Sequence, residues 1–244
     1  MAVAGHVTLK RMSNAEEPGG LTAERLAGCI DHTVLAPDHT IADVEQACAQ
    51  ALRLGFAAVS VSPYDIRRVA ERLAGSPVAP GGTVGIPFGH SAARTKEVEA
   101  AVSADAGARE VDMVLNLIAA RSGEWAHVRD EIAAVRRVAD GLVLKVILET
   151  CYLTDEAKRR ACLLAVEAGA DFVKTSTGFG PGGAMVEDVR LMKQTVGEAA
   201  RVKAAGGIRT VGQVREMLEA GAERIGTSAG VAIMDEFHAG RKVQ

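Results

Sequence analysis

Residues 168–178 read Ala168-Gly169-Ala170-Asp171-Phe172-Val173-Lys174-Thr175-Ser176-Thr177-Gly178, an order of residue types that is typical of a helix end, a strand and a turn in succession. A glycine follows an alanine-rich segment where a helix would end, a short apolar run comes next, and Lys174 closes that run before a second glycine-containing turn. Three further stretches show the same transition, namely Leu54-Gly55-Phe56-Ala57, Ala106-Gly107-Ala108 and Ala220-Gly221-Ala222-Glu223. Glycine is the usual left-handed helix end. A strand that starts directly after it is typical of a parallel sheet whose strands alternate with helices.

Short apolar or β-branched runs recur eight times along the 244 residues, beginning near Cys29, Ala57, Gly82, Glu110, Leu142, Asp171, Arg201 and Glu223. The segments between them are typical of amphipathic helices. Thr40 is placed to cap a helix from Ile41 to Leu54, and Thr154 to cap one that runs to Ala168. We predict a single (β/α)8 TIM barrel of the α/β class over residues 21–244, after a flexible N-terminal extension of residues 1–20. An open doubly wound sheet is the alternative, because periodicity does not show that a sheet closes.

The composition excludes several classes of function. Lys and Arg number 28 and Asp and Glu 31, so the net charge is -3, and no long run of one sign occurs. Nucleic acids and anionic membranes are therefore not expected as partners. Nowhere do 18 apolar residues follow one another, and no secretory signal is recognisable. The four cysteines form no C-x-x-C pair, which favours reduced thiols in a cytoplasmic protein.

Two lysines occupy matching positions, because Lys174 and Lys203 each end a short apolar run and each precede glycines. A lysine at the inner end of a buried strand is desolvated or paired, and a nearby ammonium disfavours its protonation. Either lysine could then be a free amine near neutral pH and attack a carbonyl group. The alternative is that both are ordinary strand-end lysines that reach out to water.

Polar side chains are also expected where the strands of a barrel end, the place where barrel enzymes do their chemistry. The strand ends supply Asp31, Thr33, Ser60, Asp112, Asn116, Lys145, Glu149, Lys174, Lys203 and Ser228. In the fourth run, Glu110, Asp112 and Asn116 are expected to share one face, since side chains alternate along a strand. This predicts a polar barrel interior. A structural salt-bridge network without catalysis remains the alternative.

Glycine-containing turns follow the last three strands, and they expose backbone N–H groups. They contain Gly178 with Gly180-Pro181-Gly182-Gly183, then Gly206-Gly207, and finally Gly226-Thr227-Ser228-Ala229-Gly230. Successive N–H groups at helix N-termini bind oxyanions, and glycine lets a phosphate approach closely. We therefore predict a phosphate site here, although a Gly-Gly pair by itself serves equally well as a tight turn.

Five runs together resemble the deoxyribose-phosphate aldolases, which are class I aldolases. They are Ile30-Asp31-His32-Thr33, Glu110 to Asn116, Leu144 to Thr150, Phe172 to Phe179 and Val202 to Arg209, and the resemblance extends from about Leu21 to Met234. It implies reversible cleavage of 2-deoxy-D-ribose 5-phosphate to D-glyceraldehyde 3-phosphate and acetaldehyde, in deoxyribonucleoside breakdown, without metal or organic cofactor. A homodimer or homotetramer is compatible with the sequence.

The resemblance also implies roles for individual residues. Lys174 would be the Schiff-base nucleophile, and Asp112 and Lys203 would be proton donors and acceptors. Asp31 and Thr33 would support them, and Gly178, Gly206, Gly207 and Ser228 would bind the phosphate. Repulsion from the Lys203 ammonium is expected to lower the pKa of Lys174, with burial lowering it further and Asp112 raising it.

The sequence departs from the family at Ala36, where many relatives have lysine, and at Ser60, where several have cysteine. Ala205 replaces a serine or proline, Ala229 replaces a second phosphate-facing serine, and the tail of residues 237–244 lacks a tyrosine. Three alternatives stay open: another Schiff-base aldolase, a metal-dependent aldolase and a non-catalytic phosphosugar-binding barrel. The histidines His6, His32, His39, His90, His127 and His238 show no H-x-x-x-H spacing, which disfavours the metal-dependent aldolase.

Overall fold

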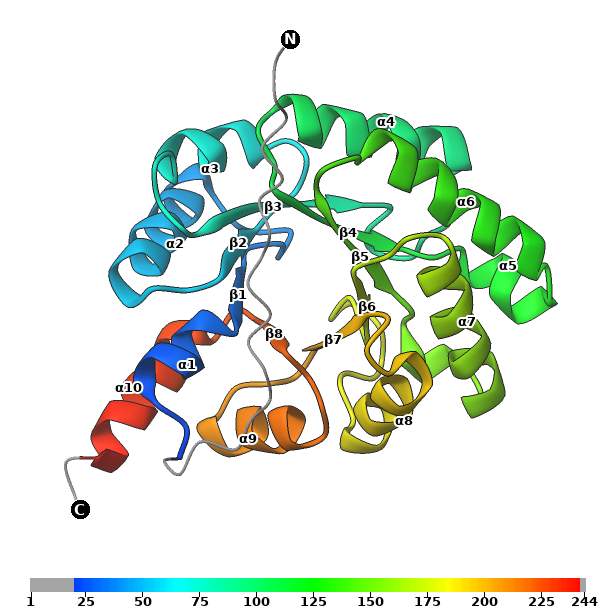
Figure 1. The fold of residues 1–244 in the computed structure, drawn as a ribbon. Coiled ribbons are helices and arrows are strands. Elements are labelled where there is room, and N and C mark those ends of the chain that lie inside the picture. Colours follow the sequence, from blue (N-terminus) through cyan, green and yellow to red (C-terminus); the bar gives the residue numbers. More distant parts are fainter. Residues whose placement is uncertain (1–19, 242–244) are drawn as a thin grey trace, which may run out of the picture.

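The computed structural model describes residues 20–241, and it shows a closed parallel barrel with helices around it (Figure 1). The predicted (β/α)8 barrel is confirmed, and the open sheet is wrong because β8 pairs with β1. The predicted extension of residues 1–20, apart from Gly20, and the last three residues of the tail lie outside the described residues. No helix among residues 20–241 combines the length and the apolar character that crossing a membrane requires.

The strands follow one another around the barrel in chain order. They are β1 (Ile30–Thr33), β2 (Ala58–Ser60), β3 (Ala79–Val84), β4 (Glu110–Val114), β5 (Val143–Ile147), β6 (Phe172–Lys174), β7 (Arg201–Ala205) and β8 (Arg224–Thr227). The helices outside are α1 (Ala23–Gly28), α2 (Ile41–Leu54), α3 (Ile66–Arg72), α4 (Ala93–Asp105), α5 (Leu117–Ser122), α6 (Trp125–Val138), α7 (Asp155–Glu167), α8 (Val186–Val196), α9 (Val211–Glu219) and α10 (Gly230–Arg241), and a 3-10 turn, η1, spans Thr150–Tyr152.

The helix ends follow the predicted chemistry. The Thr40 side chain accepts a hydrogen bond from the N–H of Asp43 and begins α2, and Gly55 ends it in the left-handed conformation at φ 75°. Thr154 caps α7 by accepting from the N–H of Ala157. Glycines after other helices, including Gly107, Gly169 and Gly221, also have positive φ. Each helix therefore stops at a defined residue and returns the chain to the next strand.

The apolar core lies between the sheet and the helices, because the outward-facing strand residues are the apolar ones. On β4 and β5 these are Val111, Met113, Leu144 and Val146, and all four side chains are fully buried. The inward-facing residues include charged ones such as Glu110, Asp112 and Lys145. The barrel is thus stabilised from its outer face, and its interior is available for polar groups.

Two local predictions were wrong. The third strand begins at Ala79 and not near Gly82, since Pro80 and two glycines hide it from a propensity argument. Close packing against α4 requires a glycine at position 82, because a Cβ at Gly82 would lie 2.8 Å from the Oγ of Ser103.

The second wrong prediction concerns Asn116, which does not share the face of Glu110 and Asp112. The strand β4 ends at Val114, and the Asn116 side chain caps α5 instead.

One buried ion pair links the helical layer to the barrel. Lys96 on α4 lies 2.8 Å from Glu131 on α6, and both side chains have zero exposure. The Lys96 Nζ also donates to the carbonyl oxygen of Val114 at the end of β4, at 2.9 Å. Removing one partner of such a pair leaves an uncompensated buried charge, whereas replacing both partners by apolar groups often costs little.

We expect Lys96→Met to lower the free energy of unfolding by about 3–5 kcal/mol, because it strands the Glu131 carboxylate. The double variant Lys96→Met with Glu131→Leu should recover most of that loss. Urea unfolding of both variants measures the difference. A double variant that loses as much as the two single variants added together would show that the pair does not act as a unit.

Candidate active site

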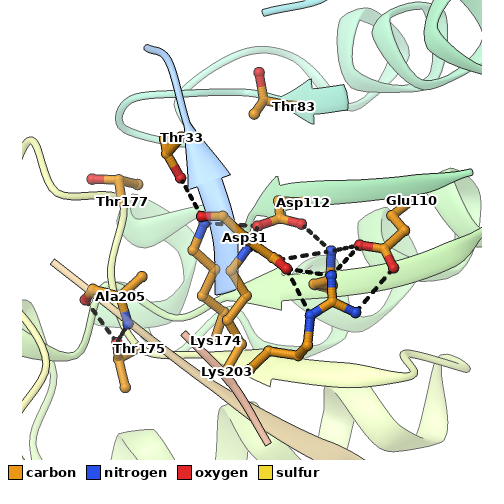
Figure 2. A network of polar contacts seen from close by, with 12 residues as sticks. Asp31, Thr33, Thr83, Glu110, Asp112, Lys174, Thr175, Thr177, Lys203 and Ala205 are labelled. Carbon is orange, nitrogen blue, oxygen red and sulfur yellow. Dashed lines mark hydrogen bonds and ion pairs between the residues drawn. The ribbon is translucent and has the colours of Figure 1, made fainter. Parts of the chain in front are cut away.

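Three lysines converge on Asp112 inside the barrel. The Asp112 Oδ2 accepts from Lys174 Nζ and from Lys203 Nζ, each at 2.7 Å, and its Oδ1 accepts from Lys145 Nζ at 2.9 Å. Figure 2 shows Lys174 and Lys203 extending side by side toward this carboxylate. The strand register explains the convergence, because Lys174 on β6 is the partner of Lys203 on β7, and Asp112 on β4 is the partner of Lys145 on β5.

Asp31 on β1 connects this cluster to a second cation. Its Oδ2 lies 2.5 Å from Lys203 Nζ and 3.4 Å from Lys145 Nζ. Its Oδ1 accepts from the guanidinium of Arg224, which also binds both oxygens of Glu110. The interior charge network therefore contains Asp31, Glu110, Asp112, Lys145, Lys174, Lys203 and Arg224.

This network holds three carboxylates and four cationic groups. Among the described residues, Lys145 has three carboxylate partners, Lys203 has two, and Lys174 has only Asp112. If every group were ionised, the buried network would carry one surplus positive charge. A neutral amine at Lys174 removes that surplus with the smallest loss of pairing.

The ionisation of the individual groups follows from these contacts. Burial alone would raise the pKa of Asp112, but the ammonium groups of Lys145, Lys174 and Lys203 hold that pKa well below its usual range. Burial alone would lower the pKa of Lys145, but Asp112, Glu110 and Asp31 raise it above its ordinary value. Asp112 is therefore an anion beside a permanent Lys145 ammonium.

Lys174 behaves differently from its neighbours. Burial lowers its pKa to about 8, Asp112 opposes that decrease, and the Lys203 ammonium adds to it. The pKa of Lys174 is lowered, as we expected. Burial makes the largest contribution to this shift, and repulsion from Lys203 makes a smaller one. A lysine with this pKa is partly unprotonated near neutral pH, and a free amine attacks carbonyl carbon atoms.

The predicted phosphate-binding residues lie at the same end of the barrel, after β6, β7 and β8. Gly178, Gly206 and Gly207 have φ of 92°, 95° and 80°, a region that favours glycine. Gly206 is also required sterically, because a Cβ there would lie 2.9 Å from the Cα of Gly183. A Cβ at Gly207 would meet no atom of the described residues within 4 Å, so its backbone faces open space there. Ser228 is exposed and precedes the N-terminus of α10.

Thr33, which we grouped with Asp31, is not part of the charge network. Its hydroxyl donates to the carbonyl oxygen of Asp31 at 3.1 Å, at the mouth end of β1 (Figure 2). Ser60 at the end of β2 is buried, and its hydroxyl has no hydrogen-bond partner within the described segment. Among the residues from 20 to 241, no group of three or more His, Cys, Asp or Glu side chains is arranged to hold a metal ion.

Sequence reasoning missed two residues near the site. Arg224 begins β8 and becomes a partner of Asp31 and Glu110 only because the barrel closes. Glu149, named only as a strand-end residue, has a fully buried side chain, and its Oε2 accepts from the backbone N–H of Thr177 at 3.1 Å and from the Thr177 hydroxyl. Burial raises the pKa of Glu149 above its ordinary value, although the hydrogen bonds from Thr177 partly oppose this. The feature of the sequence that could have identified Glu149 is a carboxylate two residues after the end of an apolar strand.

Comparisons with known proteins agree on one family. Residues 25–236 match the family described as DeoC/LacD family aldolase. A deoxyribose-phosphate aldolase of Carboxydothermus hydrogenoformans is 48% identical over 90% of this chain and 98% of its own length. One of Brevibacillus brevis is 51% identical over 84% of this chain and 93% of its own length.

Solved structures give the same result. The deoxyribose phosphate aldolase of Aeropyrum pernix, described as having a unique tetrameric structure, superposes with a TM-score of 0.82 at 33% identity and covers 89% of this chain and 93% of its own. An aldolase named QR15 superposes with a TM-score of 0.85 at 37% identity, covering 91% of this chain and 99% of its own. The predicted resemblance and the prediction of a lyase are confirmed, and the chain belongs to the DeoC/LacD family of aldolases.

Proposed function

We propose that the protein cleaves 2-deoxy-D-ribose 5-phosphate reversibly to D-glyceraldehyde 3-phosphate and acetaldehyde through a Schiff base on Lys174, and that it serves deoxyribonucleoside breakdown. The observation that carries the proposal is the pairing of Lys174, whose pKa is lowered to about 8, with a carboxylate that also binds Lys203 at 2.7 Å. The names of the relatives support the choice of substrate.

The first half of the reaction uses Lys174 as the nucleophile. Its free amine adds to the C1 aldehyde of the open-chain sugar to form a carbinolamine, and loss of water gives an iminium ion. The iminium accepts the electron pair of the C2–C3 bond when that bond breaks, while the C3 hydroxyl gives up its proton and becomes the aldehyde of glyceraldehyde 3-phosphate. Covalent catalysis thus divides one difficult step into easier ones.

Asp112 and Lys203 are the proposed proton donors and acceptors. Asp112 accepts from Lys174 and Lys203 through the same oxygen, so a proton can pass between the two amines by way of one carboxylate. The enamine left on Lys174 gains a proton at C2, and hydrolysis of the resulting iminium releases acetaldehyde and restores the amine. Asp31 holds the Lys203 Nζ at 2.5 Å and so keeps it directed at Asp112.

The phosphate is proposed to bind at Gly178, Gly206, Gly207 and Ser228. The glycines present backbone N–H groups after β6 and β7, and Ser228 precedes the N-terminus of α10, where the helix dipole favours an anion. The phosphate makes no bond change, so its binding energy positions the reacting carbonyl. A small-molecule sugar phosphate and an aldehyde are therefore the proposed partners, in a homodimer or homotetramer.

Borohydride reduction in the presence of acetaldehyde or deoxyribose 5-phosphate should irreversibly label Lys174, because it reduces the iminium to a stable amine. Mass spectrometry of the digested protein identifies the labelled residue, and Lys174→Met is the control that should take up no label. Activity should be unchanged in EDTA. Labelling confined to Lys203 or Lys145 would overturn the assignment of the nucleophile.

The pH dependence of trapping should reveal the charges around Lys174. Adduct formation needs the free amine, so the wild-type rate should rise with pH through about 8. Both lysine Nζ atoms lie 2.7 Å from one oxygen and are therefore at most about 5.4 Å apart. At an effective dielectric of about 20, their repulsion is about 3 kcal/mol, or roughly two pKa units.

Lys203→Met should therefore shift the trapping profile to higher pH, and Asp112→Asn should shift it to lower pH, because Asp112 raises the pKa of Lys174. Both variants also lose a proton-transfer group, but their pH profiles should shift in opposite directions. The direction of the shift therefore reports the electrostatic effect separately from the loss of proton transfer. A lower rate in Lys203→Met without an alkaline shift would leave Lys203 an acid–base residue but disprove the repulsion.

Gly207→Val should weaken the use of deoxyribose 5-phosphate, raising its KM by about tenfold or more. The new side chain would project into the open space that the phosphate needs, since no protein atom lies within 4 Å of a Cβ at this position. Self-condensation of acetaldehyde, which involves no phosphate, is the matched measurement. An equal loss in both reactions would indicate that the turn after β7 has collapsed, because a φ of 80° also strains valine.

A further inference from the structure

Glu149 is an unusual residue in three respects that the proposed chemistry does not use. Among residues 20–241 it is the only non-glycine residue with a positive φ, at 52°. Its side chain is fully buried, and its Oε1 has no hydrogen-bond partner in the part of the chain that the structure describes. A glutamate gains nothing from the left-handed region, which costs a residue with a Cβ of the order of 1 kcal/mol or more. The surrounding structure must therefore hold it there.

The side-chain hydrogen bonds of Glu149 lead to the turn that follows Lys174, while its carbonyl oxygen accepts from the N–H of Tyr152 at 3.1 Å. Its Oε2 accepts from the backbone N–H of Thr177 at 3.1 Å and from the Thr177 hydroxyl. The residues on either side of Glu149 bind the same segment, because the N–H of Leu148 donates to the carbonyl oxygen of Lys174 at 2.9 Å and the N–H of Thr150 donates to that of Thr175 at 3.0 Å. Backbone and side chain thus hold one turn from Lys174 to Thr177.

At its start the turn is also held by β7, because the N–H of Thr175 donates to the carbonyl oxygen of Lys203 at 3.1 Å and its hydroxyl donates to that of Ala205 at 3.0 Å, whereas Thr177 is held by Glu149. The strand β6 contains only Phe172–Lys174, so the irregular segment starts directly after the proposed nucleophile. The Thr177 hydroxyl accepts from the N–H of Phe179 at 3.1 Å, which extends the influence of Glu149 past Gly178. The chain then passes over the free Glu149 Oε1, since a Cβ at Gly180 would lie 3.3 Å from it.

We infer that Glu149 is a positioning residue that holds the turn from Lys174 to Gly178 in the shape that the phosphorylated substrate requires. This inference rests on the proposed aldol cleavage. Glu149 acts through Thr177, by offering one oxygen as an acceptor to two donors. An acceptor oxygen at this place is what the turn needs. A neutral amide also supplies such an oxygen. It costs no existing hydrogen bond, because the second carboxylate oxygen of Glu149 accepts none from the described residues.

Four variants separate this role from simpler ones. Glu149→Gly removes the side chain and relieves the backbone, since glycine adopts a positive φ freely. Glu149→Gln keeps an acceptor oxygen and removes the charge. Thr177→Val removes the hydroxyl that donates to Glu149 and accepts from the N–H of Phe179, and it keeps the shape of the side chain. Glu198→Gly is the matched control, because it removes an exposed loop glutamate whose side chain is 88% exposed and which pairs only with Lys193 at 3.4 Å.

In Glu149→Gly we expect the KM for deoxyribose 5-phosphate to rise by about 10- to 100-fold. This factor corresponds to the free energy of one hydrogen bond to a charged or buried carboxyl group. Borohydride trapping of acetaldehyde on Lys174 should change by less than about threefold, because acetaldehyde has no phosphate to position. Glu149→Gln should restore the KM. Thr177→Val combined with Glu149→Gly should raise the KM by less than the product of the two single effects, because both variants remove the same hydrogen bond between Glu149 and Thr177. The Glu198→Gly control should leave both measurements unchanged.

Amide hydrogen exchange of the peptide covering residues 174–180 tests the same inference without any substrate. Protection should fall in Glu149→Gly and stay at the wild-type value in Glu149→Gln. An unchanged KM in Glu149→Gly, or a Glu149→Gln variant as impaired as Glu149→Gly, would overturn the inference. If the wild type shows no trapping at Lys174, the proposed function fails instead, and the exchange measurement still decides the role of Glu149.

Discussion

The ion pairs of Asp112 with Lys145, Lys174 and Lys203 are the constraint on which the rest of the site depends. Burying charges is costly, and a buried ion pair seldom adds net stability compared with apolar groups of similar size. The protein meets this cost outside the sheet, where the apolar outward faces of the strands pack against the helices. Because stability is supplied there, the barrel interior can hold a charged network that is suited to chemistry.

Within that network the number of carboxylate partners decides which lysine has a lowered pKa. Lys145 contacts three carboxylates and has a raised pKa, whereas Lys174 contacts one and has a pKa lowered to about 8. Both are deeply buried, so the difference comes from pairing. One surplus cation in a buried cluster thus selects the lysine at the mouth of the barrel as the free amine.

The sequence predicted those parts of the site that follow from strand periodicity. Lys174 and Lys203 lie at the ends of neighbouring apolar runs, so a parallel sheet had to place them side by side, and alternation along β4 put Asp112 on the inner face. Arg224 could not be predicted, because an arginine at the start of a strand resembles a surface residue until β8 closes against β1. Asn116 was misplaced because the strand ends two residues earlier and the same side chain serves as a helix cap.

Glu149 shows why some functional geometry stays hidden from a sequence. Its backbone conformation is unfavourable for its residue type, so no propensity argument points to it, and its partner Thr177 is 28 residues away in the chain. The register of β5 against β6 brings the two together, with backbone hydrogen bonds to Lys174 and Thr175 on either side of Glu149. Because β6 is only three residues long, the turn begins directly after Lys174, whose side chain is held separately by Asp112 at 2.7 Å. The amine of Lys174 is therefore placed by the interior charge network, whereas the shape of the adjacent turn depends on the contacts of Glu149 with Thr177.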